Sequence, residues 1–242
     1  METNIWSSLK PIDLTKIKVY PFPENKYFKE EQVKTQICLH HTVSGPSIDG
    51  DVSSWIDNKD RVATAIIVAR DGTPYQLFPS KYWAYHLGAG DHNQDRRSIG
   101  IEIDNWGWLT PGTGSLKTYR IERPKYYIPW SLKVTDPNKF YAYYGNAVDV
   151  PMQYYPNGFR GYKYYEKYTD AQIQTVGELL LLWRNKYGIP LNYKEYMFEF
   201  SSSARELGTP GVWTHCSFRK DKTDIHSQPE LIEMLKAIQN IP

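Results

Sequence analysis

The stretch TQICLHHTV, residues 35–43, is the part of the sequence that decides the fold. Its apolar and β-branched residues predict a buried strand that ends at His40 and His41. A second run, SIGIEI at residues 98–103, has the same character and carries Glu102 between two isoleucines. Alternation turns Glu102 to the face opposite those isoleucines, and burial of an unpaired carboxylate is costly. Both predicted strands therefore carry polar groups that need an explanation.

The rest of the chain alternates between further strands and helices. Additional strands are expected at residues 62–69, 74–78 and 211–215, and helices at residues 52–58, 171–187 and 229–239. Asp51 is expected to cap the first helix, and Thr169 or Asp170 the second, which stops at Gly188. Strands interleaved with helices predict a single α/β domain.

Residues 104–167 differ in composition from the segments on either side. They hold most of the 20 tyrosines, many of the prolines and glycines, and no helical period. Their aliphatic content is too low for a separate core, so we interpret them as an aromatic insertion of loops and short hairpins within one domain. Residues 1–32 are polar and interrupted by prolines, which predicts an irregular lead-in. The main domain is therefore expected to span residues 33–242.

The composition excludes several classes of protein. A formal net charge of +2 with scattered basic residues does not predict nucleic-acid binding. Two cysteines, Cys38 and Cys216, are too few for a disulfide scaffold. No apolar run is long enough for a transmembrane helix, and the first residues lack the apolar segment of a secretory signal. We expect a protein that is made in the cytoplasm without a signal peptide and does not insert into membranes.

A third segment adds polar groups near the end of the chain. His215 closes the 211–215 run, and Lys222 and Asp224 follow it. Two imidazoles and a carboxylate are a ligand set of catalytic zinc, which keeps a fourth position open for water. A nearby carboxylate can then accept a proton, and a lysine can stabilise a developing oxyanion. Each residue alone also fits a structural role, so the residues by themselves indicate a metal hydrolase and no more.

Five blocks of sequence occur in an order that resembles a known family: ICLHHTVSG, ATAIIVARDGTPYQLFP, WAYHLGAGDHNQDRRSIGIEIDN, YTDAQIQ and THCSFRKDKTD. They are similar to the zinc-dependent N-acetylmuramoyl-L-alanine amidases, whose fold is shared with peptidoglycan recognition proteins and phage lysozyme-type amidases. The blocks leave out the aromatic insertion. The resemblance implies a mixed central β-sheet flanked by helices, with a zinc ion (Zn²⁺) in a surface groove of an amidase catalytic domain.

The resemblance also assigns roles to individual residues. The zinc ligands of the family correspond to His40, His215 and Asp224. The general base of one branch of the family corresponds to Glu102. The lysine that faces the oxyanion corresponds to Lys222.

The substrate groove of the family passes three further positions. His86 lies in the W-x-Y-H-x-G segment and matches a histidine of this groove, and we place His41 and Thr64 there as well. Many relatives have a tyrosine before the R-D-G turn, where this chain has Thr64 and Ala65. The branch that depends on that tyrosine is therefore excluded, and proton transfer is left to Glu102.

The identity of the third zinc ligand has alternatives. The run between His215 and Asp224 lacks the usual spacing of the family, so His226 or Cys216 could replace Asp224. Adjacent residues on a strand face opposite sides, which argues against His215 and Cys216 binding one metal ion. Cys38 lies two residues before the first ligand on the same strand face, and belongs either to the core or to the surroundings of the metal.

The expected function is hydrolysis of the amide bond between N-acetylmuramic acid and L-alanine in bacterial peptidoglycan. The missing signal fits a phage endolysin that reaches the wall after release, or a cytosolic enzyme that trims recycled muropeptides, and the insertion favours the endolysin. A non-catalytic peptidoglycan-binding protein on the same fold is the alternative, but it would be expected to lose a ligand. A zinc peptidase is disfavoured because no H-E-x-x-H helix is present. We expect the protein to be a monomer, and we expect its binding partners to be peptidoglycan or muropeptides.

Aromatic pairs recur along the insertion: Tyr126-Tyr127, Tyr143-Tyr144, Tyr154-Tyr155 and Tyr164-Tyr165. Neighbours on a strand face opposite sides, so one ring of each pair is expected to face the substrate while the other packs inward. The alternative is a structural flap that does not touch the substrate.

Overall fold

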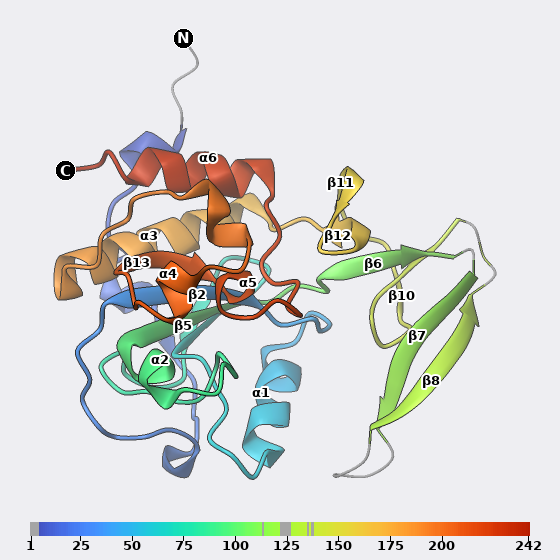
Figure 1. Cartoon of the computed structure of the whole chain (residues 1–242), viewed down its shortest axis with the longest axis horizontal. Helices are drawn as coiled ribbons and strands as arrows, with labels where there is room; N and C mark the ends of the chain where they lie inside the picture. The colour runs from blue at the N-terminus through green and yellow to red at the C-terminus, as the bar shows by residue number, and fades with distance from the viewer. Residues whose placement is uncertain (1–4, 113, 122–126, 135, 137) are drawn as a thin grey trace.

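The computed structural model describes residues 5–112, 114–121, 127–134, 136 and 138–242, with the side chains of residues 113–135 and 137 left out. Its centre is a six-stranded mixed sheet in the order β1-β4-β3-β5-β2-β13 (Figure 1). The strands are β1 (Lys18–Val19), β2 (Gln36–His41), β3 (Ile66–Val68), β4 (Pro74–Gln76), β5 (Ser98–Ile103) and β13 (Gly211–Thr214). Strands β3, β5, β2 and β13 run parallel, and β4 runs antiparallel to β3.

Helices lie on both sides of this sheet. They are α1 (Ile48–Asp57), α2 (His92–Arg97), α3 (Asp170–Tyr187), α4 (Ser202–Arg205), α5 (His215–Phe218) and α6 (Pro229–Ile238). Figure 1 shows α3 and α6 stacked on one side of the sheet, and α1 and α2 on the other. This arrangement confirms the predicted α/β domain with a mixed sheet flanked by helices. None of the helices in the described part of the chain is long and apolar enough to cross a lipid bilayer.

The longest helix, α3, has the expected ends. Thr169 accepts a hydrogen bond from the backbone of Gln172, whose side chain bonds back to Thr169, so the pair forms a capping box. Gly188 ends the helix in the left-handed conformation. Ile173 and three leucines of this helix, Leu179, Leu180 and Leu181, then pack into the main core.

Residues 5–32 are tied to the sheet more closely than an irregular lead-in suggests. They contain three short 3-10 helices, η1 (Ile5–Ser8), η2 (Leu14–Lys16) and η3 (Glu24–Lys26), and β1 pairs in parallel with β4. Four apolar side chains of this segment are buried in the main core: Trp6, Ile12, Phe22 and Tyr27. Apolar residues scattered among prolines gave no period from which this packing could be predicted.

The first helix begins earlier than predicted, and Asp51 is not its cap. Ser47 caps α1 by accepting a hydrogen bond from the backbone N–H of Gly50. Asp51 is buried within the first turns, where its carboxylate bonds to the Ser44 hydroxyl. A serine just before an apolar residue was the better capping signal here.

The predicted strand at residues 62–69 is shortened to β3. Its first residues leave the sheet ladder, because Val62 forms only an isolated bridge to Tyr85 and the N–H of Ala63 donates to the Tyr85 carbonyl. The strand at 211–215 also ends one residue early. His215 is the first residue of α5, where the Thr214 N–H meets the Ser217 hydroxyl.

The aromatic insertion forms small sheets of its own. A five-stranded sheet has the order β10-β9-β6-β12-β11, and β7 pairs with β8 in a separate hairpin to one side of the main sheet (Figure 1). The strands are β6 (Trp108–Pro111), β7 (Gly114–Ile121), β8 (Tyr127–Val134), β9 (Phe140–Tyr141), β10 (Ala147–Val148), β11 (Met152–Phe159) and β12 (Tyr162–Glu166). Trp108 and Tyr165 are buried at the centre of a small aromatic cluster. Aromatic rings therefore form a small core within the insertion, which its low aliphatic content did not predict.

In β11 and β12 the two rings of each aromatic pair differ in exposure, as alternation predicts, whereas Tyr143 and Tyr144 lie in a turn. Tyr154 is 47% exposed, whereas Tyr155 bonds to His226. Tyr165 is fully buried, next to a partly covered Tyr164. Tyr126 and the side chain of its neighbour lie outside the described residues.

The two ends of the insertion are held together by the main domain. The guanidinium of Arg70 lies between Asp104, at the start of the insertion, and Glu166, at its end. Nε and Nη2 of Arg70 each lie 3.0 Å from a Glu166 carboxylate oxygen. The backbone N–H of Glu166 also donates to the carbonyl of Gly107. The insertion thus leaves and re-enters the main domain at neighbouring points.

Candidate functional site

Pairing between β2 and β5 places two polar side chains next to each other. The strands are parallel, and His40 is the direct partner of Glu102. Direct partners on neighbouring strands point to the same face, so both side chains leave the sheet on the side of α1. His215 follows the end of the adjacent strand β13, which brings it to the same edge.

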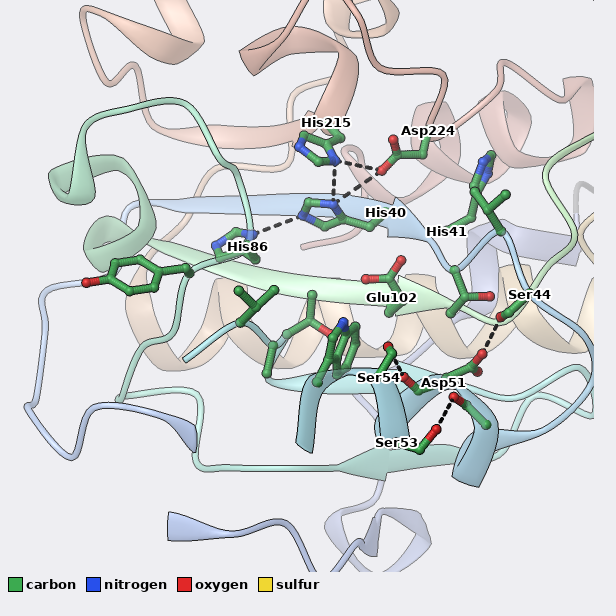
Figure 2. A pocket seen from close by; sticks show the side chains of 18 of the residues that line it. His40, His41, Ser44, Asp51, Ser53, Ser54, His86, Glu102, His215 and Asp224 are labelled. Carbon is green, nitrogen blue, oxygen red and sulfur yellow. Dashed lines mark hydrogen bonds and ion pairs between the residues drawn. The ribbon is translucent and has the colours of Figure 1, made fainter. Parts of the chain in front are cut away.

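A pocket of about 490 Å³ opens over these strand ends (Figure 2). It contains every site residue predicted from the sequence: His40, His41, Thr64, His86, Glu102, His215, Lys222 and Asp224. Its opposite wall is a polar stretch of α1, and Tyr144 reaches it from the insertion. Segments far apart in the chain therefore meet in one cavity.

Three ligand atoms converge on one side of this pocket. Nδ1 of His40 lies 3.0 Å from Nδ1 of His215 and 3.3 Å from Oδ2 of Asp224. Nδ1 of His215 lies 2.9 Å from the same carboxylate oxygen. The three residues are buried, and their ligand atoms all lie within 4.8 Å of one another. Figure 2 shows both rings and the carboxylate pointing to a common centre.

The hydrogen bonds of His215 decide which ring nitrogen carries its proton. Nε2 lies 2.9 Å from the backbone carbonyl of Leu87, and a carbonyl can only accept. Nε2 therefore carries a proton, and Nδ1 is the nitrogen that faces a carboxylate oxygen of Asp224, at 2.9 Å. A cation shared by these two atoms, either a proton or a metal ion, would hold them at this distance.

A chain of hydrogen bonds gives His40 the same orientation. The Ser98 hydroxyl donates to the carbonyl of Gln94 at 2.7 Å, so its oxygen is free to accept from Nε2 of His86 at 2.8 Å. The bare Nδ1 of His86 then accepts from Nε2 of His40 at 2.9 Å. Burial and the adjacent His215 lower the pKa of His40 to about 4, which keeps its ring neutral. Its Nδ1 is thus a bare lone pair that faces the same centre.

Asp224 supplies the negative charge of this cluster. Burial alone would raise the pKa of its carboxyl group, but His215 and His40 outweigh burial and hold this pKa well below its usual range. The cluster thus places an ionised carboxylate beside two imidazole nitrogens. Neutral nitrogen and anionic oxygen in this number are a donor set suited to zinc.

The alternative ligands lie in less favourable positions. Both ring nitrogens of His226 are already used, Nδ1 by the Tyr155 hydroxyl at 2.9 Å and Nε2 by the Glu166 carbonyl at 3.0 Å. The thiol of Cys216 points to the backbone carbonyls of Lys222 and Asp224. His215 and Cys216 are in a helix, so strand alternation was the wrong reason to separate them.

Cys38 belongs to a second group of neighbouring ligand atoms. This group consists of Cys38, His40 and His86. The Cys38 side chain is fully buried and lies outside the pocket lining, and burial raises the pKa of its thiol well above the usual value. Both ring nitrogens of His86 already form hydrogen bonds, one with His40 and the other with Ser98. The geometry therefore favours the group that contains Asp224.

The family model described as N-acetylmuramoyl-L-alanine amidase matches residues 30–227. The chain belongs to this family. The match spans β2 to β13, the pocket and the insertion, and it ends just after Asp224 and His226. Among curated proteins, no sequence matches the chain.

Several solved structures are similar to this member of the amidase family. The endolysin N-acetylmuramoyl-L-alanine amidase LysCS from Clostridium intestinale URNW is 15% identical, with 95% of this chain and 99% of that chain covered and a TM-score of 0.47. A selenomethionine derivative of AmpD is 17% identical, with 89% and 90% covered and a TM-score of 0.46. A mutant of PlyL is 21% identical, with 36% of this chain and only 57% of that chain covered and a TM-score of 0.32.

In this amidase-family chain, Glu102 lies in the pocket, and no described residue forms an ion pair with it. It is 7% exposed, and no described residue donates a hydrogen bond to its carboxylate. Burial raises the pKa of Glu102 well above its usual value, and the nearby Asp224 and Asp51 raise it further, whereas Lys222 opposes them. A carboxyl group in this environment is suited to hold and release a proton.

The remaining predicted residues of the amidase groove differ in their surroundings. Thr64 lines the pocket, and its hydroxyl bonds to the carbonyl of Ile66. His41 also borders the pocket, but its ring turns away from His40 (Figure 2) and Nδ1 lies 2.8 Å from the Tyr168 hydroxyl. Direct substrate contacts of His41, Thr64 and His86 stay predictions.

Residues of α1 that line the pocket were missed by the sequence reasoning. Asp51 is 6% exposed, and its Oδ2 is buried without a hydrogen-bond partner. Burial raises its pKa to about 7, against the effect of the Ser44 hydroxyl. Ser53, Ser54 and Trp55 line the same wall. An acidic residue near a helix start suggested a cap, and only the tertiary structure shows that it faces the pocket.

Proposed function

We propose that this chain is a zinc-dependent amidase that hydrolyses the bond between N-acetylmuramic acid and L-alanine in peptidoglycan. The observation that carries the proposal is the convergence of three ligand atoms beside a buried carboxyl group. Nδ1 of His40 and Nδ1 of His215 face each other and an oxygen of the Asp224 carboxylate. Glu102 opens into the same pocket. A purely structural cluster would not be expected to leave so many acceptors facing each other.

Zinc fits this group of atoms better than a proton does. One proton can bridge only one pair of these atoms, whereas a metal ion can bind all three ligand atoms at once. Zinc commonly binds two histidines and a carboxylate in catalytic sites and leaves a fourth position open. A zinc ion bound here would polarise a carbonyl group and make water more acidic.

The side chains around this site have complementary roles in amide hydrolysis. Glu102 accepts the proton of the attacking water and returns it to the leaving nitrogen. The ammonium group of Lys222 stabilises the negative charge that develops on the carbonyl oxygen. Both residues line the same pocket as the three ligands.

Digestion of purified peptidoglycan tests this function directly. The zinc-loaded protein should release peptides with a free L-alanine amino group and leave intact glycan strands, as identified by mass. New reducing sugar ends would identify a glycosidase instead. New amino groups within the peptide stem would identify a peptidase. Binding without any new ends would support a non-catalytic peptidoglycan-binding protein.

We further propose that the enzyme acts on the polymeric wall as an endolysin rather than on recycled muropeptides. Tyr144 of the insertion is 46% exposed and lines the pocket, so the insertion extends the surface next to the reacting bond. Its ring contacts Tyr143, which in turn contacts Trp108. Exposed aromatic faces suit contact with sugar rings, and a long glycan strand would reach beyond the pocket.

Tyr144→Ala is expected to weaken cleavage of insoluble peptidoglycan about fivefold, through loss of roughly 1 kcal/mol of ring contact. Cleavage of a small soluble muropeptide should change less than twofold. Tyr196→Ala is the matched control, because Tyr196 is 50% exposed but lies outside the pocket. Equal losses on both substrates, or no loss on either, would contradict a role for Tyr144 in capture of the polymer.

Ser98→Ala is expected to weaken zinc binding about tenfold, the lower end of the range for residues that orient metal ligands. Loss of the hydroxyl leaves Nε2 of His86 without its acceptor, so the ring can rotate or change tautomer and release His40. Competition with a chromophoric chelator measures the affinity. Ser80→Ala removes a comparable buried hydroxyl far from the site and should leave zinc affinity unchanged. An unchanged affinity in Ser98→Ala would show that this chain does not orient His40.

A further inference from the structure

The turn between β11 and β12 holds an arginine in an unusual backbone conformation. Arg160 and Gly161 form this two-residue turn with φ angles of +47° and +92°. Positive φ at both positions favours asparagine and glycine, and an arginine costs about 1 kcal/mol there. A residue kept in an unfavourable conformation points to a function of its side chain.

The side chain of Arg160 bonds to the loop that leads to the third ligand. Its Nε–H donates to the carbonyl of Lys222 at 2.9 Å. Nη2 donates to the carbonyls of Arg219, at 3.4 Å, and Lys220. Guanidinium groups present several donors in a fixed plane, so one side chain can hold three carbonyls of a loop at once.

The same hairpin also holds the chain on the other side of Asp224. Nε2 of His226 donates to the Glu166 carbonyl, which leaves Nδ1 to accept from the Tyr155 hydroxyl at 2.9 Å. Tyr155 lies in β11 and Glu166 in β12. The hairpin therefore binds the chain on both sides of Asp224. Arg160 contacts the residues before it, and Tyr155 contacts His226 after it.

We propose that Arg160 is a positioning residue, which aligns the loop at residues 219–224 so that the Lys222 ammonium faces the reacting carbonyl. This inference rests on the proposed amidase function of the pocket. The hairpin β11–β12 therefore helps to hold the catalytic site in place, in addition to any contact with the wall polymer. The effect of Arg160 on the reaction passes through Lys222.

Arg160→Asn is the informative variant, because asparagine tolerates the positive φ of the turn and removes only the guanidinium. In the full-length, zinc-loaded protein we expect kcat to fall about tenfold while KM changes less than twofold. Amide hydrogen exchange at residues 219–224 should become faster. Lys163→Asn, an exposed cation of the same hairpin, is the matched control and should change none of these quantities.

A double-mutant cycle with Lys222→Ala separates positioning from a general loss of structure. If Arg160 acts through Lys222, adding Arg160→Asn to Lys222→Ala should lower kcat less than twofold further. A full tenfold loss in that background, or unchanged kcat in the single variant, would overturn the inference.

Hydrogen exchange distinguishes this inference from the proposed function. A wild-type protein that cleaves no peptidoglycan but shows faster exchange at residues 219–224 in Arg160→Asn would refute the amidase proposal and support the loop contact. An active wild-type protein with unchanged exchange and kcat in Arg160→Asn would refute the role of Arg160 alone.

Discussion

His215→Ala is expected to abolish stoichiometric zinc binding, and with it all amide hydrolysis. The variant removes one of three ligand atoms that meet within 4.8 Å, and the two that remain cannot enclose the ion. His40→Ala and Asp224→Ala should have the same effect. Zinc content per chain after dialysis, measured by atomic spectroscopy, provides the readout, and thermal melting shows whether each variant folds.

His226 is the control for these three variants. It is fully buried, but both of its ring nitrogens bond to neighbours other than the ligand centre. His226→Gln keeps a side chain that can form hydrogen bonds and should retain one zinc ion per chain. Loss of zinc from His226→Gln, together with its retention in Asp224→Ala, would show that Asp224 is not the third ligand.

Glu102→Gln is expected to lower kcat by about 10²–10⁴, the usual range for a lost general acid–base. Glutamine has nearly the same shape, so zinc content and melting temperature should stay close to those of the wild type. The buried carboxyl group has no hydrogen bond in the described structure that the variant could break. Turnover of a soluble muropeptide by the zinc-loaded variant measures the fall in kcat separately from any change in binding to the cell wall.

Near-wild-type turnover in zinc-loaded Glu102→Gln would mean that another group transfers the proton. Asp51 would then be the nearest candidate, because its carboxyl group lies in the same pocket and its pKa is raised to about 7. Asp51→Asn in the same assay distinguishes the two carboxyl groups. A large loss in Asp51→Asn with none in Glu102→Gln would exchange their roles.

The strands of the site could be predicted because their side chains are strongly patterned. The runs at 35–43 and 98–103 are apolar enough to require burial, and β2 and β5 lie within them. Their register was not predictable, because it depends on contacts between segments far apart in the chain. That register makes His40 and Glu102 direct partners. The resemblance to a family supplied residues that pattern alone left ambiguous.

Other parts of the site depend on tertiary contacts that leave no local signal. Asp51 had the features of a helix cap, yet Ser47 took that role and left the carboxyl group facing the pocket. His215 was expected in a strand, and a helix starts there instead. Arg160 lies in the insertion, where sequence reasoning expected substrate contacts rather than support for Lys222.

Arg70 has a consequence for how such a chain can diverge over evolutionary time. By joining Asp104 to Glu166, it holds the two ends of the insertion at neighbouring points of the main domain. Loops anchored at neighbouring points can lengthen at little entropic cost, since that cost grows only with the logarithm of their length. The outer strands of the insertion can therefore change in length while its two ends stay where they are. The turn at Arg160 is the part of the insertion that such exchanges would have to preserve.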